Sequence, residues 1–310
     1  MWRAAASTII GRVSPTVLVA TDLTTYSEPA LVRARAHAEA KGGALVVCHV
    51  IPDVMRHHPL SASRDANDTV LAGDLTKKAA DLVAEQVGRV LRLSVDDYKI
   101  VVETGRAEDE IVRISEEAGA ALIVIGARPR EGSERVLGHV AERVVRYAHT
   151  SVLIARAHAS TGKILVATDF TDGSAAALKL GGELVTKLAV DGTLLHVVQL
   201  PSESSALAAV SSALGSPWMA PSQTAIESLE TLGRSTLEGL AKQYGFTHVA
   251  QVEGTPAEII VAQAESLNAE MILMGSRGRT GLARLVLGST AEKVIRTSTM
   301  SVLVARDSLA

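Results

Sequence analysis

The chain is poor in cysteine and in aromatic residues. Cys48 is the only cysteine, so no disulfide can form within the chain and no multi-cysteine metal site exists. It lies in the apolar run 44–50, which favours a buried, unreactive thiol. Aromatic residues make up only 3% of a sequence that is 47% hydrophobic. The core must therefore be built from Val, Leu, Ile and Ala, and this composition favours strands packed against helices.

Strong charge bias and long apolar runs are also missing. The formal net charge is −3, which provides no basic surface for nucleic acid and no polybasic segment for a membrane surface. No stretch approaches the roughly 18 uninterrupted apolar residues of a membrane helix. Arg12 interrupts the weakly apolar N-terminal stretch, so a cleaved signal is not favoured. We therefore expect a cytoplasmic protein without nucleic-acid or membrane partners.

The sequence contains one series of motifs twice. The segment TVLVATDLT at 16–24 recurs as KILVATDFT at 163–171, and four further pairs of matching segments follow in the same order. This period is too long for a solenoid and indicates a duplicated domain. The small, polar stretch 157–162 is the expected linker. We therefore predict one domain at 1–158 and a second at 159–310.

Each half alternates short apolar runs with longer amphipathic stretches. In the second half, the apolar runs predict five strands, near 163–168, 193–198, 248–252, 271–274 and 301–305. Nearly continuous apolar strands that alternate with helices indicate parallel strands buried on both faces. We therefore predict an α/β fold with two tandem doubly wound sheets, each of five parallel strands with helices on both faces.

A glycine-rich segment without acidic residues runs from Met274 to Thr290. Its framing glycines are Gly275, Gly278 and Gly288. Glycines let main-chain N–H groups approach a ligand, and a helix N-terminus favours phosphate. The segment is therefore typical of a phosphate-binding loop, although it matches neither the Walker A pattern nor GxGxxG. Two ordinary roles stay open: the glycines could only form turns, and Ser289 with Glu292 is a capping box that would start a helix in any case.

The spacing G-x2-G-x9-G-S, read from Gly275 to Ser289, resembles the ATP-binding signature of the universal stress protein family. The opening segment at 163–171 and the closing strand at 301–306 resemble the same family. The resemblance implies the strand order 3-2-1-4-5 in each domain, with the ligand between strands 1 and 4. It also implies a stress-response protein whose C-terminal domain binds an adenine nucleotide, ATP with Mg²⁺, and which changes state or partner when the nucleotide is bound.

The resemblance assigns a set of residues to this nucleotide site. They are Ala167, Thr168 and Asp169 at the end of the first strand, Val197 in the second strand, Met274 and Gly275 at the end of the fourth strand, and Arg277, Gly278, Gly288, Ser289 and Thr290 around the phosphates. In the resemblance, Asp169 lies close to the nucleoside and the main chain of Val197 reads the adenine edge. Each also has an ordinary alternative, an Asx turn for Asp169 and strand core for Val197.

The N-terminal half departs from the family signature. In the segment that begins at Gly126, Pro129 replaces the second glycine and so removes a main-chain donor. His139 replaces the serine, and Glu131 and Glu134 add negative charge. We predict that this half keeps the fold and has lost tight ATP binding, while weak binding of another ligand stays open.

Two functions compete with nucleotide-dependent regulation. A slow ATPase would need Asp169 or His196 to position a water and a metal, but no dedicated base, Walker B strand or arginine finger is recognisable. Whether the chain is an enzyme is therefore left open, with weak hydrolysis as the most that we expect. A scaffold that binds no nucleotide, or another small ligand, is the second alternative, and the intact glycine loop argues against it.

Several features are left without a role. The long connections at 52–73 and 201–222 are lids, partner sites or short surface helices. Vicinal His57 and His58 would need a further ligand to hold zinc, so a solvated loop is favoured.

The last strand of each half, at 151–156 and at 301–306, is an apolar edge that is prone to pair. In the family such strands pair across a two-fold axis, so the resemblance implies an internal pseudo-dimer with pseudo-two-fold symmetry. Association into a homodimer and the protein partners are not fixed by the sequence.

Overall fold

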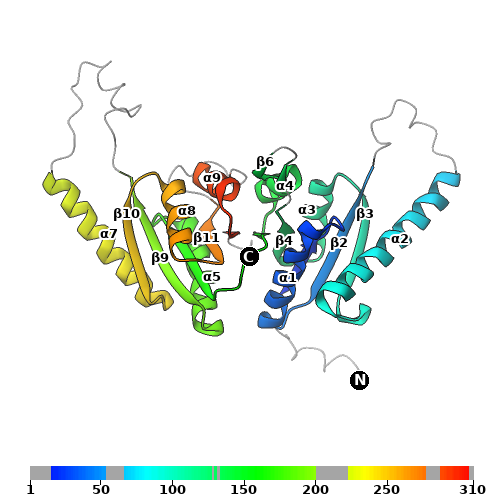
Figure 1. Cartoon of the computed structure of the whole chain (residues 1–310), viewed down its shortest axis with the longest axis horizontal. Coiled ribbons are helices and arrows are strands. Elements are labelled where there is room, and N and C mark those ends of the chain that lie inside the picture. The colour runs from blue at the N-terminus through cyan, green and yellow to red at the C-terminus, as the bar shows by residue number, and fades with distance from the viewer. Residues whose placement is uncertain are drawn as a thin grey trace, which may run out of the picture. The chain divides into compact units, whose positions relative to one another are not determined.

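The computed structural model describes residues 15–53, 66–127, 129–130, 133–199, 223–276 and 287–306. These residues divide into two compact units that separate between Ala157 and His158. Each unit is an α/β domain in which helices flank a parallel sheet (Figure 1).

The sheet of the N-terminal unit has five parallel strands. They are β1 (Thr16–Ala20), β2 (Leu45–Pro52), β3 (Lys99–Gly105), β4 (Ala120–Gly126) and β7 (Ser151–Ala155), in the order β3-β2-β1-β4-β7. A hairpin that the sequence did not predict follows β4. It pairs β5 (Pro129–Arg130) with β6 (Ser133–Leu137) in antiparallel fashion.

The C-terminal unit repeats this sheet. Its strands are β8 (Lys163–Thr168), β9 (Asp191–Val198), β10 (His248–Glu253), β11 (Met271–Gly275) and β12 (Ser301–Ala305), in the order β10-β9-β8-β11-β12. Numbered within each unit, both orders read 3-2-1-4-5. The strands lie within a few residues of the predicted ranges, because each follows an uninterrupted apolar run.

In the described residues, four longer helices cover each sheet. In the N-terminal unit they are α1 (Glu28–Lys41), α2 (Ala66–Leu91), α3 (Ala107–Glu117) and α4 (His139–Tyr147), with short 3-10 turns η1 (Thr25–Ser27) and η2 (Val95–Asp97). In the C-terminal unit they are α5 (Asp172–Leu188), α7 (Gln223–Tyr244), α8 (Pro256–Ser266) and α9 (Ser289–Thr297). The helices pack in pairs, α1 with α2, α3 with α4, α5 with α7 and α8 with α9. Because the strand order reverses at β1 and β8, right-handed crossovers place the two pairs of a unit on opposite faces.

The core is aliphatic, as the composition requires. Leu18 of β1 and Leu165 of β8 are fully buried at the centres of their sheets. Cys48 of β2 is also fully buried, and burial raises the pKa of its thiol to about 12. The prediction of an inert thiol is thereby supported on structural grounds.

The end of the linker is fixed to the C-terminal unit. Glu270 is buried, and its carboxylate accepts hydrogen bonds from Ser160 Oγ at 2.8 Å and from the N–H of Thr161 at 3.2 Å. Thr161 Oγ1 in turn donates to the carbonyl of Asn268 at 2.8 Å. A buried carboxylate is stable only when donors surround it, so these bonds hold the chain in one conformation as it enters β8.

In the part of the chain that the structure describes, no helix has the length and hydropathy to cross a membrane. His57, His58 and the segment 201–222 lie outside the described residues. The cytoplasmic location and the pairing of the two last strands stay predictions.

Candidate functional site

The best candidate site lies at the carboxyl edge of the C-terminal sheet. Strand β8 ends at Thr168 between its neighbours β9 and β11, which is where the strand order reverses. In open α/β sheets this point leaves a crevice between the loops on either side. A cavity of about 280 Å³ lies there.

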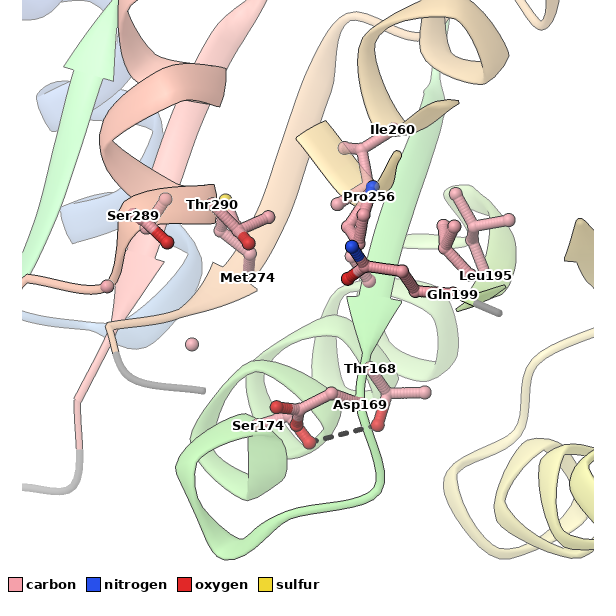
Figure 2. A pocket seen from close by; sticks show the side chains of 15 residues that line it. Thr168, Asp169, Ser174, Leu195, Gln199, Pro256, Ile260, Met274, Ser289 and Thr290 are labelled. Carbon is pink, nitrogen blue, oxygen red and sulfur yellow. Dashed lines mark hydrogen bonds between the residues drawn. The ribbon is translucent and has the colours of Figure 1, made fainter. Parts of the chain in front are cut away.

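The structure brings most of the predicted site residues together around this cavity. Nine of them line it: Ala167, Thr168, Asp169, Val197, Met274, Gly275, Gly288, Ser289 and Thr290. The remaining two, Arg277 and Gly278, lie outside the described residues. Six further lining residues were not predicted: Ser174, Leu195, Gln199, Pro256, Ile260 and Ala291. Figure 2 shows Ser289 and Thr290 on one side of the cavity, Pro256 and Ile260 on the other, and Asp169 at its lower edge.

The turn after β8 is held by hydrogen bonds from its own side chains. Thr168 Oγ1 lies 2.9 Å from Ser174 Oγ and accepts from the N–H of Phe170 at 3.1 Å. Asp169 Oδ1 accepts from the N–H of Thr171 at 3.1 Å and from its Oγ1 at 2.6 Å. This is the Asx turn that is the ordinary alternative role of Asp169. It also fixes the carboxylate at the edge of the cavity, so the two roles are compatible.

Ser174 could have been found in the sequence. The pattern T-D-x-T-x-x-S occurs at 168–174 and again at 21–27. The hydroxyl pair of Thr168 and Ser174 has its counterpart in Thr21 and Ser27, also 2.9 Å apart. The common spacing of the two halves was therefore a usable signal.

Gly275 allows a close approach between β11 and the start of α5. A Cβ at this position would lie 2.0 Å from the carbonyl oxygen of Gly173 and 3.1 Å from the Cα of Ser174. No side chain fits there, because both neighbours belong to the main chain. The glycine is therefore required to bring the end of β11 against the turn that follows β8.

Val197 offers its main chain at the edge of the cavity. Thr168, the last residue of β8, pairs with His196, so the ladder between β8 and β9 stops one residue before Val197. The carbonyl of Val198 accepts from the N–H of Gly254, which continues from β10. Because main-chain groups of successive strand residues point to alternate sides, those of Val197 point toward the side where β8 has ended.

The start of α9 differs from the prediction. Ser289 is its first residue, and Gly288 is the N-cap with φ −64° and ψ 146°. The capping box, which was the ordinary alternative for Ser289 and Glu292, therefore does not start this helix. Ser289 lies one position too far along, inside the first turn. Its N–H and that of Thr290 are among the donors that an α-helix cannot satisfy internally.

The acidic residues near this helix start have basic partners. Glu292 O𝜀1 lies 2.8 Å from Arg296, and Glu258 Oε1 lies 2.7 Å from Lys293. The hydrogen bond from Lys293 lowers the pKa of Glu258. Because these carboxylates are paired with basic side chains, they neutralise less of the partial positive charge at the helix N-terminus than unpaired carboxylates would.

His196 does not line the cavity. It is buried, and its Nδ1 lies 2.8 Å from the carbonyl oxygen of Thr168. The ring of Phe170 stacks on it with centroids 4.0 Å apart and 27° between the planes. Asp169 is thus the one ionisable group among the described lining residues. No cluster of three or more His, Cys, Asp or Glu in the described ranges is arranged to hold a metal ion.

The model of the universal stress protein family matches residues 15–156 and 161–306. The chain belongs to the universal stress protein family. It is similar to Universal stress protein MJ0531 of Methanocaldococcus jannaschii, with 32% identity over 148 residues that cover 46% of this chain and 81% of the relative.

Two longer matches span both units of this universal stress protein. A universal stress protein of Mycolicibacterium smegmatis is 24% identical over 305 residues, which cover 94% of this chain and 96% of the relative. The crystal structure of a universal stress protein from Archaeoglobus fulgidus superimposes with a TM-score of 0.65 at 24% identity, covering 94% of this chain and 98% of that one. At this identity the structural match establishes a common fold.

The N-terminal unit of this universal stress protein has a cavity at the corresponding edge of its sheet. Its volume is about 530 Å³. His139, the first residue of α4, lines it, and Pro129 opens the hairpin that replaces the glycine loop. Glu131 lies outside the described residues. The loss of tight ATP binding in this unit stays a prediction.

Proposed function

We propose that the C-terminal unit binds an adenine nucleotide, ATP with Mg²⁺, and that the chain acts as a nucleotide-dependent regulatory or protective module. One observation carries the proposal: the end of β8 and the first turn of α9 line the same cavity. These segments are more than a hundred residues apart in the chain and each supplies a different half of a nucleotide site.

The lining groups fit the parts of a nucleotide. Val197 presents main-chain donor and acceptor groups in the plane of the sheet, as recognition of a purine edge requires. Asp169 lies at the cavity edge with a fixed carboxylate, which is suited to ribose hydroxyls. The volume of about 280 Å³ is near the lower end of the range for small-molecule pockets, about 300–1,000 Å³.

The phosphate end is formed by the start of α9. Ser289 and Thr290 contribute first-turn N–H groups, and Gly288 precedes them without a side chain. An anion at this position gains from both the unsatisfied donors and the helix dipole. Bound Mg²⁺ would neutralise charge on the phosphates, and Asp169 is the described lining residue that would hold it or its water.

Binding is favoured over hydrolysis. A hydrolytic site needs a group that positions the attacking water. His196 is buried under Phe170 and does not line the cavity, and the carboxylate of Asp169 is already assigned to the ribose or the metal. A single-turnover assay tests this: phosphate release that Asp169→Asn abolishes while ATP binding persists would establish an ATPase instead.

The binding test uses a matched pair of glycine substitutions. Gly288 and Gly138 are the N-caps of α9 and α4, with φ −64° and −63° and ψ 146° and 148°. Valine fits both conformations, so Gly288→Val and Gly138→Val should perturb their helices alike. We expect Gly288→Val to weaken ATP-Mg²⁺ binding at least about tenfold in calorimetry, because charged hydrogen bonds contribute about 1.5–3 kcal/mol.

Gly138→Val should leave the affinity for ATP unchanged. Equal losses in the two variants, or a wild-type chain that binds no ATP, would refute the proposal. Mass spectrometry of small molecules released from protein purified without added nucleotide identifies which adenine nucleotide is carried.

A further inference from the structure

The N-terminal cavity has a different character from the proposed nucleotide site. Its volume is about 530 Å³, against about 280 Å³ in the C-terminal unit. Aliphatic side chains from three elements, including Val50, Ile111 and Ile125, form much of its wall. Neither this cavity nor the C-terminal one has a lysine or arginine among its described lining residues. The larger volume and the aliphatic wall therefore suit a ligand with a larger apolar body.

The inner end of the cavity keeps the geometry of the C-terminal site. Asp22 Oδ1 accepts from the N–H of Thr24 at 3.0 Å and from its Oγ1 at 2.6 Å. His49 Nδ1 lies 2.9 Å from the carbonyl oxygen of Thr21. A Cβ on Gly126 would lie 2.2 Å from the carbonyl oxygen of Tyr26, just as a Cβ on Gly275 in the C-terminal unit would lie 2.0 Å from the carbonyl oxygen of Gly173. The turn and the strand ends at this cavity are thus held by contacts that match those of the C-terminal site.

The end that would hold phosphates is altered. In the hairpin, Pro129 pairs with Leu137 and Arg130 with Ser133. Main-chain groups that pair within this ladder are not available to a ligand, and proline has no N–H to offer. At the start of α4, the exposed imidazole of His139 stands where α9 has the smaller side chain of Ser289. α4 keeps the glycine N-cap and the first-turn N–H groups that α9 has, so among the described residues it is the paired hairpin, Pro129 and the larger side chain of His139 that disfavour a polyphosphate here.

An aromatic side chain has been added at the cavity. Tyr26 occupies the position that Gly173 has in the matching motif, and it is among the residues that line the cavity, while 49% of the residue is exposed. The turn that carries it is braced by the buried Gln86, which accepts from Thr21 Oγ1 at 2.6 Å and donates to the carbonyl of Thr24 at 3.2 Å. A ring on a rigid turn loses little entropy when a ligand stacks on it.

We propose that the N-terminal cavity binds an uncharged, planar aromatic ligand without phosphate, whose ring stacks on Tyr26. The aliphatic wall and a half-exposed tyrosine among the lining residues favour this class of ligand. The site is separate from the proposed nucleotide site and does not depend on it.

The test uses the full chain and two neutral probes. Adenosine tests a ligand that also uses hydrogen bonds, and the fluorescent dye N-phenyl-1-naphthylamine tests a purely apolar one. Both are titrated in the presence of saturating ATP-Mg²⁺, which occupies the proposed C-terminal site. We expect at least one probe to bind with one equivalent per chain, and Tyr26→Ala to weaken it about tenfold, since stacking of a base on an aromatic ring contributes about 1–3 kcal/mol.

Two further variants distinguish a stacking role from a general disturbance. Tyr26→Phe keeps the ring and should keep the affinity. Tyr147→Ala removes a tyrosine of similar exposure, 46%, that does not line the cavity, and should change nothing. The proposal is overturned if neither probe binds, if ATP displaces the probe, or if Tyr26→Ala and Tyr147→Ala behave alike. Titration of ATP alone reports on the nucleotide site independently.

Discussion

Gly275→Ala tests the close approach that builds the floor of the C-terminal cavity. The added Cβ would lie 2.0 Å from the oxygen and 2.7 Å from the carbon of the Gly173 carbonyl. Contacts under 3.0 Å do not occur for real Cβ atoms, and these neighbours are main chain, so either β11 or the start of α5 must move. Overpacking of this kind lowers the free energy of unfolding by about 1–3 kcal/mol.

The expected change is large enough to measure. For a unit of this size, a loss of about 2 kcal/mol lowers the melting temperature by roughly 4–8 °C. Thermal and urea unfolding of the full chain, followed by circular dichroism, would report it. Because the chain has two units, the affected transition is identified by whether ATP-Mg²⁺ still shifts it.

Gly239→Ala is the matched control. Gly239 lies inside α7, and a Cβ there would meet nothing within 4 Å. Alanine is the better helix former, so this variant should raise the free energy of unfolding by about 0.5–1 kcal/mol. If Gly275→Ala were as stable as wild type and bound ATP with unchanged affinity, the floor would not be closely packed and the argument from Gly275 would fail.

Two other predictions concern stability and reactivity. Ala189 ends α5 and Gly42 ends α1, both in the left-handed conformation, with φ 52° and 59°. Glycine adopts this conformation without strain, so Ala189→Gly should raise the free energy of unfolding by about 1 kcal/mol. Gly42→Ala should lower it by a similar amount, and urea titrations measure both changes. Equal signs for the two would contradict the conformational argument. Burial raises the pKa of Cys48 from 9.0 to about 12, so folding favours the neutral thiol; this contribution to stability is complete below pH 9 and is lost between pH 9 and 12. A thiol reagent at pH 8 should therefore label Cys48 only at the rate of unfolding, and rapid labelling of the folded chain would show that the thiol is accessible.

Much of the C-terminal site could be predicted because its residues follow strands. β8 and β11 are uninterrupted apolar runs, and parallel strands end at one edge of a sheet. This alone brings Asp169 near Gly275 without knowledge of any side-chain contact. The family resemblance then supplied Val197, which strand periodicity would have assigned to the core.

Other parts depended on information that local sequence does not hold. The pattern at Ser289 and Glu292 is the same whether the serine is the N-cap or the first helical residue, and the extended conformation of Gly288 decides between them. Pro256 and Ile260 reach the cavity from α8, and only the packing of that helix places them there. The hairpin after β4 forms between segments that carry no apolar alternation, so strand patterns gave no signal for it.

The bonds to Glu270 decide where the chain can be divided. A fragment that began at Lys163, the first residue of β8, would lack Ser160 and Thr161 and so would remove two donors from a carboxylate that is only 6% exposed. Loss of partners from a buried charge is strongly destabilising, whereas a fragment that starts at His158 keeps both. The N-terminal boundary of a stable C-terminal fragment is therefore set by the buried side chain of Glu270, which precedes β11, and not by the first residue of β8.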